Sequence, residues 1–128
     1  MSLSILVVDD EPSTLKMLRL LLKIKRPDWT LHTADNGQKA LALVASQPVD
    51  CVLLDISMPD MDGLEVCERM RQLPNMQLVP IVIFTALDTL DRRDRAMAVG
   101  ATAFWVKTFQ ASEFVPQIEQ LVAQAKQG

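Results

Sequence analysis

Short runs of Val, Ile and Leu alternate along this chain with longer stretches in which apolar residues recur at helical spacing. Runs of this length and composition predict β-strands. We expect strands at residues 4–8, 29–34, 51–54, 81–84 and 103–106. The third and fourth runs are apolar throughout, as expected of strands that helices cover on both faces.

After each run, apolar residues repeat every three or four positions, which predicts a helix following each strand. Pro12 and Asp62 are typical helix-start residues for the first and third helices. Gly100 ends the fourth, where a left-handed residue is expected. The predicted inner faces hold Leu15, Leu18 and Leu22; Ala40, Leu43 and Val44; Val66 and Met70; Ala96 and Val99; and Ile118, Leu121, Val122 and Ala125.

Five β-α units in succession predict an α/β fold, with a parallel sheet doubly wound by helices on both faces. Right-handed crossovers leave few strand orders, and 2-1-3-4-5 is a common one for five strands. A length of 128 residues without an internal repeat or linker suits one domain. We therefore expect residues 1–128 to form a single domain around one five-stranded parallel sheet.

Three carboxylates are predicted to meet at one edge of this sheet. Ligands of open α/β sheets bind beyond the carboxyl ends of the strands where the strand order reverses, here between strands one and three. Asp9 and Asp10 follow strand one, and Asp55 follows strand three. Three close carboxylates either keep protons or bind a hard cation. Mg²⁺ suits the site because it takes one or two carboxylates and leaves positions open for phosphate oxygens.

A hydroxyl and an ammonium group are expected at the same edge, because Thr85 follows strand four and Lys107 follows strand five. Together with a metal ion, these groups suit the stabilisation of a transferring phosphoryl group. A carboxylate can also be the covalent acceptor, which gives an aspartyl phosphate. Each residue has a simpler role open to it, such as helix capping for Asp9 and Asp10. Their joint occurrence at equivalent strand ends favours a shared phosphoryl-transfer site over these separate roles.

The composition excludes several other classes of protein. A formal net charge of −3 does not suit non-specific binding to nucleic acid. The early apolar run 5–8 is closed by Asp9, Asp10 and Glu11, so it predicts neither a signal peptide nor a membrane span. Cys51 and Cys67 lie in apolar surroundings without metal-site spacing, which predicts buried thiols and a cytoplasmic protein.

Four motifs resemble the receiver domain of bacterial two-component response regulators: "ILVVDDE", "LLDISMPDMDG", "IVIFTA" and "GATAFWVK". The resemblance runs from about Ser4 to about Val122. It implies a flavodoxin-like (βα)5 fold, and the order 2-1-3-4-5 is that of the chemotaxis member of this family. The predicted strand order therefore rests on this resemblance as much as on the topology rules.

The resemblance implies a phosphoacceptor and a metal site. Asp55 would receive a phosphoryl group from a phosphohistidine on a histidine kinase or a histidine phosphotransfer protein. Asp10 and Asp55 would bind Mg²⁺ (or Mn²⁺) together with the backbone carbonyl of Ser57, and Asp9 would act mostly through a bound water. The domain would then catalyse its own Mg²⁺-dependent phosphorylation and a slow dephosphorylation.

The resemblance also implies a switch. Thr85 would move to hydrogen-bond the phosphoryl group, Lys107 would pair with it, and Phe104 would change rotamer with Thr85. This would link the site to the face of helix four, strand five and helix five. The same face is a candidate interface for a homodimer. Tyrosine is common at the position of Phe104, and phenylalanine cannot donate a hydroxyl bond. We expect no effector domain in these residues, and the downstream effector stays unknown.

Two positions set further expectations. Proline usually follows the lysine in this family, often after a cis bond, but Thr108 follows Lys107 here, so we predict a trans peptide. Ser57 and Leu87 are expected to tune the phosphoryl lifetime. Because apolar Leu87 does not orient an attacking water, we predict slow self-dephosphorylation.

Two alternatives and one surface stay open. A degenerate receiver acting as a constitutive protein-interaction module has its main support in Thr108, and the intact Asp10, Asp55, Thr85 and Lys107 oppose it. A phosphatase of the haloacid dehalogenase type would need a D-x-D motif after strand one, where the sequence is "DDEPST". A basic face on helix one is either solvated or a dock for an acidic kinase surface; its residues are Lys16, Arg19, Lys23 and Arg26.

Overall fold

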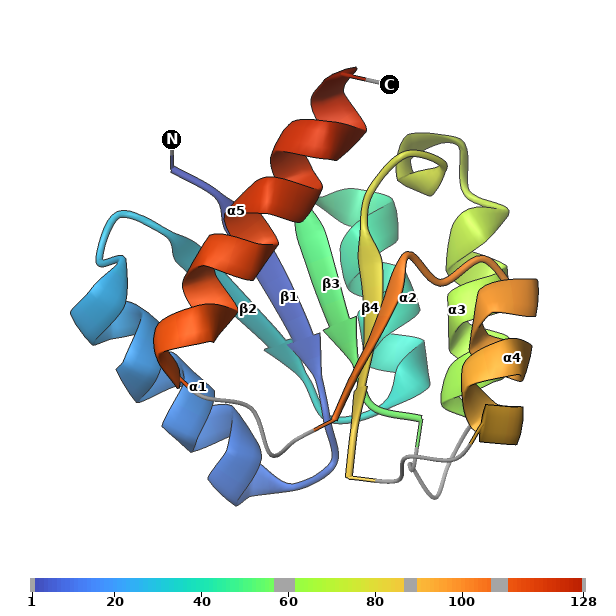
Figure 1. The fold of residues 1–128 in the computed structure, drawn as a ribbon, viewed down its shortest axis with the longest axis horizontal. Coiled ribbons are helices and arrows are strands. Elements are labelled where there is room, and N and C mark those ends of the chain that lie inside the picture. Colours follow the sequence, from blue (N-terminus) through green and yellow to red (C-terminus); the bar gives the residue numbers. More distant parts are fainter. Residues whose placement is uncertain (1, 57–61, 87–89, 107–110, 128) are drawn as a thin grey trace.

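The computed structural model describes residues 2–56, 62–86, 90–106 and 111–127. Five parallel strands form one sheet in the order β2-β1-β3-β4-β5 (Figure 1). The predicted α/β class and strand order are therefore confirmed. The strands are β1 (Ser4–Val8), β2 (Thr30–Ala34), β3 (Cys51–Leu54), β4 (Ile81–Thr85) and β5 (Ala103–Val106).

A helix follows each strand, so the predicted alternation is confirmed in the described parts of the chain. The helices are α1 (Pro12–Lys25), α2 (Gly37–Ser46), α3 (Gly63–Arg71), α4 (Leu90–Ala98) and α5 (Ala111–Gln127). A short 3₁₀ helix, η1 (Pro74–Met76), precedes β4 and was not anticipated. Helices α1 and α5 lie on one face of the sheet, and α2, α3 and α4 lie on the other (Figure 1).

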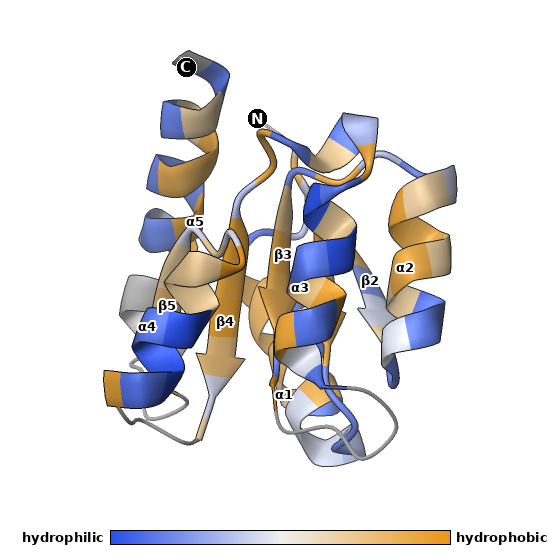
Figure 2. Cartoon of the chain, turned by 90° about the vertical axis from the view of Figure 1, so that its right-hand side faces the viewer, coloured by the Kyte–Doolittle hydropathy of each residue, from blue (hydrophilic) through white to orange (hydrophobic). Residues whose placement is uncertain are grey.

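The core consists of two apolar layers separated by the sheet. In Figure 2, β3 and β4 are coloured largely as hydrophobic, whereas α4 is coloured largely as hydrophilic. Side chains alternate between the two faces of a strand. In β4, Ile81 and Ile83 therefore pack toward α2, α3 and α4, whereas Val82 and Phe84 pack toward α1 and α5. Every residue of β3 and β4 is buried, as their continuous apolar sequences predict.

The predicted helix-boundary residues have the expected local roles. Pro12 is the first residue of α1, where its missing N–H costs no hydrogen bond. The Asp62 carboxylate accepts a 2.9 Å hydrogen bond from the backbone N–H of Leu64 and caps α3. Gly100 follows α4 with φ of 100°. Within the described ranges, none of the helices is long and apolar enough to cross a membrane.

Candidate functional site

Backbone hydrogen bonds fix Asp9 and Asp55 at the carboxyl ends of neighbouring strands. β1 and β3 pair in parallel, so their carboxyl ends lie at the same edge of the sheet. The N–H of Asp55 donates to the carbonyl of Val8 over 2.9 Å, and the N–H of Asp9 donates to the carbonyl of Ala34 over 3.1 Å. The sheet's hydrogen-bond pattern therefore continues past the strands and holds both residues.

The three carboxylates predicted to converge do so. One carboxylate oxygen from each of Asp9, Asp10 and Asp55 lies within 4.8 Å of the other two. The exposed fraction is 0% for Asp9 and 4% for Asp55, and Asp10 is more exposed. Unit charges about 4 Å apart repel by about 4 kcal/mol at an effective dielectric constant of 20. A cluster of oxygen donors with this separation fits a hard divalent cation such as Mg²⁺.

Asp9 has a second contact that bears on its capping role. Its Oδ1 accepts a 2.9 Å hydrogen bond from the N–H of Glu11. Glu11 precedes the first residue of α1, and its own side chain makes no capping hydrogen bond to the helix. Asp9 therefore tethers the start of α1 while its carboxylate stays in the acidic cluster. Asp9 does not cap α1 itself, because the N–H that it accepts from belongs to the residue before the helix.

Thr85 is brought to the same edge of the sheet. It is the last residue of β4, it has an exposed fraction of 0%, and β4 pairs with β3. On its other side, Thr85 pairs with Val106 of β5. A fully buried hydroxyl beside the strand that carries Asp55 agrees with the predicted position of this residue.

Four residues named by the sequence analysis lie outside the described part of the chain: Ser57, Leu87, Lys107 and Thr108. The backbone ligand at Ser57, the roles of Leu87 and Lys107, and the trans peptide before Thr108 therefore stay predictions.

A close backbone contact near Asp55 was missed by the sequence analysis. A Cβ added to Gly63 would lie 2.5 Å from the carbonyl oxygen of Asp55 and 2.3 Å from the Cα of Ile56. The start of α3 therefore packs directly against the backbone that leaves the acidic cluster. The sequence signal is Gly63 directly after the helix-start residue Asp62, because glycine lacks the Cβ that would clash at this position.

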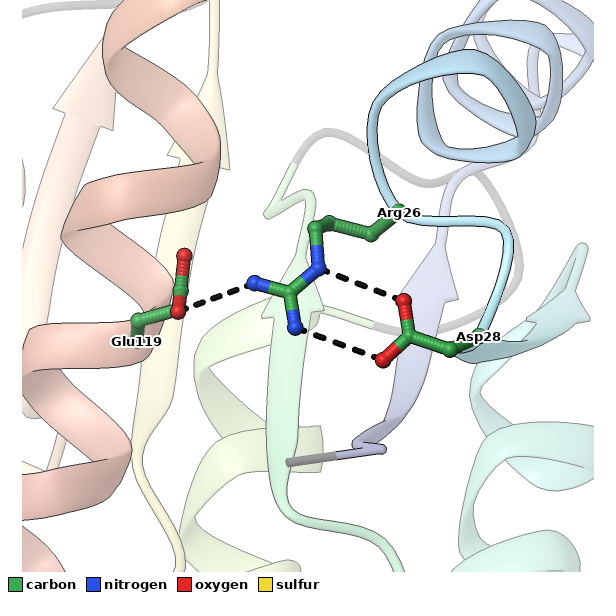
Figure 3. A network of polar contacts seen from close by, with 3 residues as sticks. All are labelled: Arg26, Asp28 and Glu119. Atoms are coloured by element: carbon green, nitrogen blue, oxygen red, sulfur yellow. Dashed lines mark hydrogen bonds and ion pairs between the residues drawn. The ribbon is translucent and has the colours of Figure 1, made fainter.

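The basic face of α1 is smaller than the sequence suggested. Arg26 donates to both carboxylate oxygens of Asp28 at 3.3 Å and contacts Glu119 of α5 at 2.9 Å (Figure 3). Its guanidinium also lies 4.8 Å from the ring centroid of Trp29. Hydrogen bonds from Arg26 lower the pKa of Asp28, and those to Asp28 and Glu119 raise the pKa of Arg26. Arg26 thus joins α1 to α5.

The family model for the response regulator receiver domain matches residues 5–119. This span includes the whole acidic cluster and all five strands except Ser4. The chain therefore belongs to the response regulator receiver domain family, the receiver domains of two-component signalling systems.

Individual relatives agree with this assignment. Response regulator MprA of Mycobacterium ulcerans is 34% identical over 126 residues, which are 98% of this chain and 53% of MprA. Signal transduction histidine-protein kinase BarA of Escherichia coli is 31% identical over 112 residues, 86% of this chain and 12% of BarA. The chemotaxis protein CheY4 of Vibrio cholerae has a structure with a TM-score of 0.87 and 26% identity, covering 94% of this chain and 99% of CheY4. The chain thus spans about half of MprA and a small part of BarA.

Proposed function

We propose that this domain is a phosphorylation-controlled switch in which Asp55 accepts a phosphoryl group from a phosphohistidine on a histidine kinase or phosphotransfer protein. The observation that carries the proposal is the acidic cluster, in which carboxylate oxygens of Asp9, Asp10 and Asp55 lie within 4.8 Å of one another. Burial of carboxylates beside one another costs free energy unless a cation or another partner compensates their charge. The cluster suits a metal-assisted acceptor site in a family of signalling receivers.

Each residue of the cluster has a distinct part in the proposed reaction. An oxygen of Asp55 forms the new P–O bond as the P–N bond of the donor breaks, which leaves the phosphoryl group on Asp55. Asp10 and Asp55 would hold Mg²⁺ (or Mn²⁺) with the carbonyl of Ser57, and Asp9 would act through a bound water. When bound, the cation neutralises negative charge on the carboxylates and the phosphoryl oxygens.

The remaining site residues act on the phosphoryl group after transfer. Thr85 would donate its hydroxyl to a phosphoryl oxygen and Lys107 would pair with another. Phe104 would move with Thr85 and carry the signal to the face of α4, β5 and α5. Ser57 and Leu87 would set the lifetime, and replacing Leu87 by Glu should speed the slow self-dephosphorylation by orienting water.

Helix α1 is the surface that best fits the phosphodonor. Three of its large apolar side chains are exposed: Met17 at 51%, Leu20 at 55% and Ile24 at 76%. Lys16 and Lys23 are exposed on the same helix. Because Arg26 is held by Asp28 and Glu119, Lys16, Arg19 and Lys23 are the residues of the basic face left to meet an acidic rim. We place the partner kinase in the cytoplasm with this domain.

An alternative function is a degenerate receiver that acts as a constitutive protein-interaction module. A homodimer through α4, β5 and α5 is compatible with either function. The two functions differ in whether Asp55 is ever phosphorylated. The test is intact mass after incubation with acetyl phosphate and Mg²⁺, for wild type, Asp55→Asn and the control Asp94→Asn, an exposed carboxylate on α4.

The switch requires one added phosphoryl group on wild type and on Asp94→Asn, none on Asp55→Asn, and none when a chelator is present. No adduct on any protein, together with no binding of the phosphoryl mimic BeF₃⁻, would favour the interaction module instead.

A further inference from the structure

The pairing of β4 with β5 places Thr85 and Phe104 on the same face of the sheet. Thr85 lies opposite Val106, and Ile83 lies opposite Phe104. Side chains alternate along each strand, so all four of these residues point to the same side. Ile83 and Phe104 both pack into the layer under α2, α3 and α4. Thr85 and Phe104 are therefore diagonal neighbours on that face.

Arg93 of α4 covers the ring of Phe104. The Cζ atom of Arg93 lies 5.0 Å from the ring centroid, within the distance of about 6 Å at which a cation is attracted to an aromatic face. Both side chains are half-buried, so water only partly screens the contact. Phenylalanine has no hydroxyl to bind a fixed partner. The position of this ring therefore depends on apolar packing and on Arg93.

Helix α4 connects this contact to the molecular surface. Two of its apolar side chains are exposed, Leu90 at 75% and Met97 at 52%. Arg95 lies 4.0 Å from Asp91 in an exposed ion pair on the same helix. Movement of the Phe104 ring would release Arg93 and so change the charges and the apolar surface that α4 presents.

We propose that Arg93 is a positioning residue of the switch, whose guanidinium holds the Phe104 ring in the arrangement described here and opposes its movement when Thr85 engages a phosphoryl group. The inference rests on the proposed function and adds a residue that regulates it. Arg93 thereby sets how much of the binding free energy of the phosphoryl group is used to displace the ring.

The test compares the affinity of variants for BeF₃⁻ in the presence of Mg²⁺, measured by isothermal titration. Arg93→Gln removes the cation and should bind BeF₃⁻ about two- to fivefold more tightly than wild type, the size expected for a partly exposed cation–π contact. The control is Arg95→Gln, which removes the same charge from the same helix without a contact to Phe104. It should bind as wild type does.

A double-mutant cycle shows whether the effect passes through the ring. In a Phe104→Leu background, Arg93→Gln should no longer change the affinity, because the aromatic face is gone. Arg93→Lys keeps a cation that can sit over the ring without the planar guanidinium, so its affinity should fall between those of wild type and Arg93→Gln.

Three results would overturn the inference. Arg93→Gln could bind BeF₃⁻ no more tightly than Arg95→Gln, or its effect could persist unchanged in Phe104→Leu. Either result, with wild type binding BeF₃⁻ normally, removes the role of Arg93 and leaves the proposed function intact. If wild type binds no BeF₃⁻ and gains no phosphoryl mass, the proposed function fails and the role of Arg93 fails with it.

Discussion

The backbone of Gly63 lies so close to that of Ile56 that a β-carbon on residue 63 would come within 2.3 Å of the Ile56 Cα. Ile56 directly follows the proposed acceptor Asp55, and Gly63 is the first residue of α3. The absence of a side chain at position 63 therefore determines how closely α3 approaches the acidic cluster.

Replacing Gly63 by Ala should displace this backbone, because the neighbouring atoms belong to the main chain and cannot rotate away. We expect the free energy of unfolding to fall by about 1–3 kcal/mol, as in other overpacked sites. Phosphorylation of Asp55 by acetyl phosphate should slow as well. Urea unfolding and intact-mass time courses measure the two effects. Glu68→Ala on the exposed side of α3 is the control, and a Gly63→Ala variant that matches it in both assays would contradict the prediction.

Both thiols should be unreactive in the folded protein. Burial raises the pKa of Cys51 to about 12 and that of Cys67 to about 11. At pH 8 the thiolate fraction of Cys67 is then about one in a thousand, and the thiolate is the reactive form. Native protein should therefore react very slowly with a disulfide reagent such as DTNB, whereas urea-unfolded protein should release two equivalents of the coloured thiol, one for each cysteine. Rapid release of one equivalent from native protein would contradict the prediction that both thiols are unreactive.

The Arg26–Asp28 pair should make stability depend on pH at the acid end. In the folded protein, the hydrogen bond from Arg26 lowers the pKa of Asp28 below its ordinary value of 3.8. A carboxylate with a lowered folded pKa stabilises the fold above its unfolded pKa, and this contribution is lost as the pH falls through the folded value. Asp28→Asn should therefore be less stable than wild type at pH 7. The difference should shrink below about pH 3.8.

Urea unfolding of wild type and Asp28→Asn at pH 7 and at pH 3 measures this change. Asp94→Asn is the matched control, since it removes a carboxylate that is exposed on α4. If the free energies of unfolding of Asp28→Asn and wild type differ by the same amount at both pH values, ionisation of Asp28 does not contribute to stability.

Arg71 should be the arginine whose loss most destabilises α3. Its Nε donates to the carbonyl of Gly100 over 2.7 Å, and its Nη1 donates to those of Met76 and Val79, each over 2.6 Å. Its Nη2 also donates to the hydroxyl of Thr102 over 3.0 Å. Arg71→Met leaves these carbonyls without their donor, which should lower the free energy of unfolding by about 1–3 kcal/mol.

The control for Arg71 is Arg69 on the same helix. Arg69 is half-exposed and pairs with Glu65 over 2.8 Å. Exposed pairs of this kind contribute about 0.2–1 kcal/mol, so Arg69→Met should cost less than Arg71→Met. Arg71→Lys should recover only part of the loss, because one ammonium group cannot reach all of these acceptors. Equal unfolding midpoints for the two Met variants would contradict the prediction.

The strands and the acidic cluster were predictable because they depend on local patterns and on general rules of topology. The apolar runs differ from the observed strands only by Trp29, which precedes β2, and by Thr85, which extends β4. The meeting of Asp10 and Asp55 followed from the strand order, since parallel strands bring their carboxyl ends to the same edge.

The side-chain contacts that were missed join different secondary-structure elements. Nothing near Arg26 in the sequence indicates that its guanidinium meets Glu119 of α5. Nothing near Arg93 indicates that it lies over Phe104. Such contacts depend on how the helices pack against the sheet. The periodicity of apolar residues predicts which face of a helix is buried, but not which residues that face contacts.

The sequence by itself therefore determined the α/β class, the order of the elements and the identity of the clustered carboxylates, because hydrophobic periodicity and chain connectivity are written along the chain. Only the tertiary structure decided that Gly63 has no room for a side chain, that Arg26 is withdrawn from the basic face of α1 and that Arg93 covers Phe104. These depend on distances between packed elements, and close packing of the interior sets such distances only once all the elements are in place.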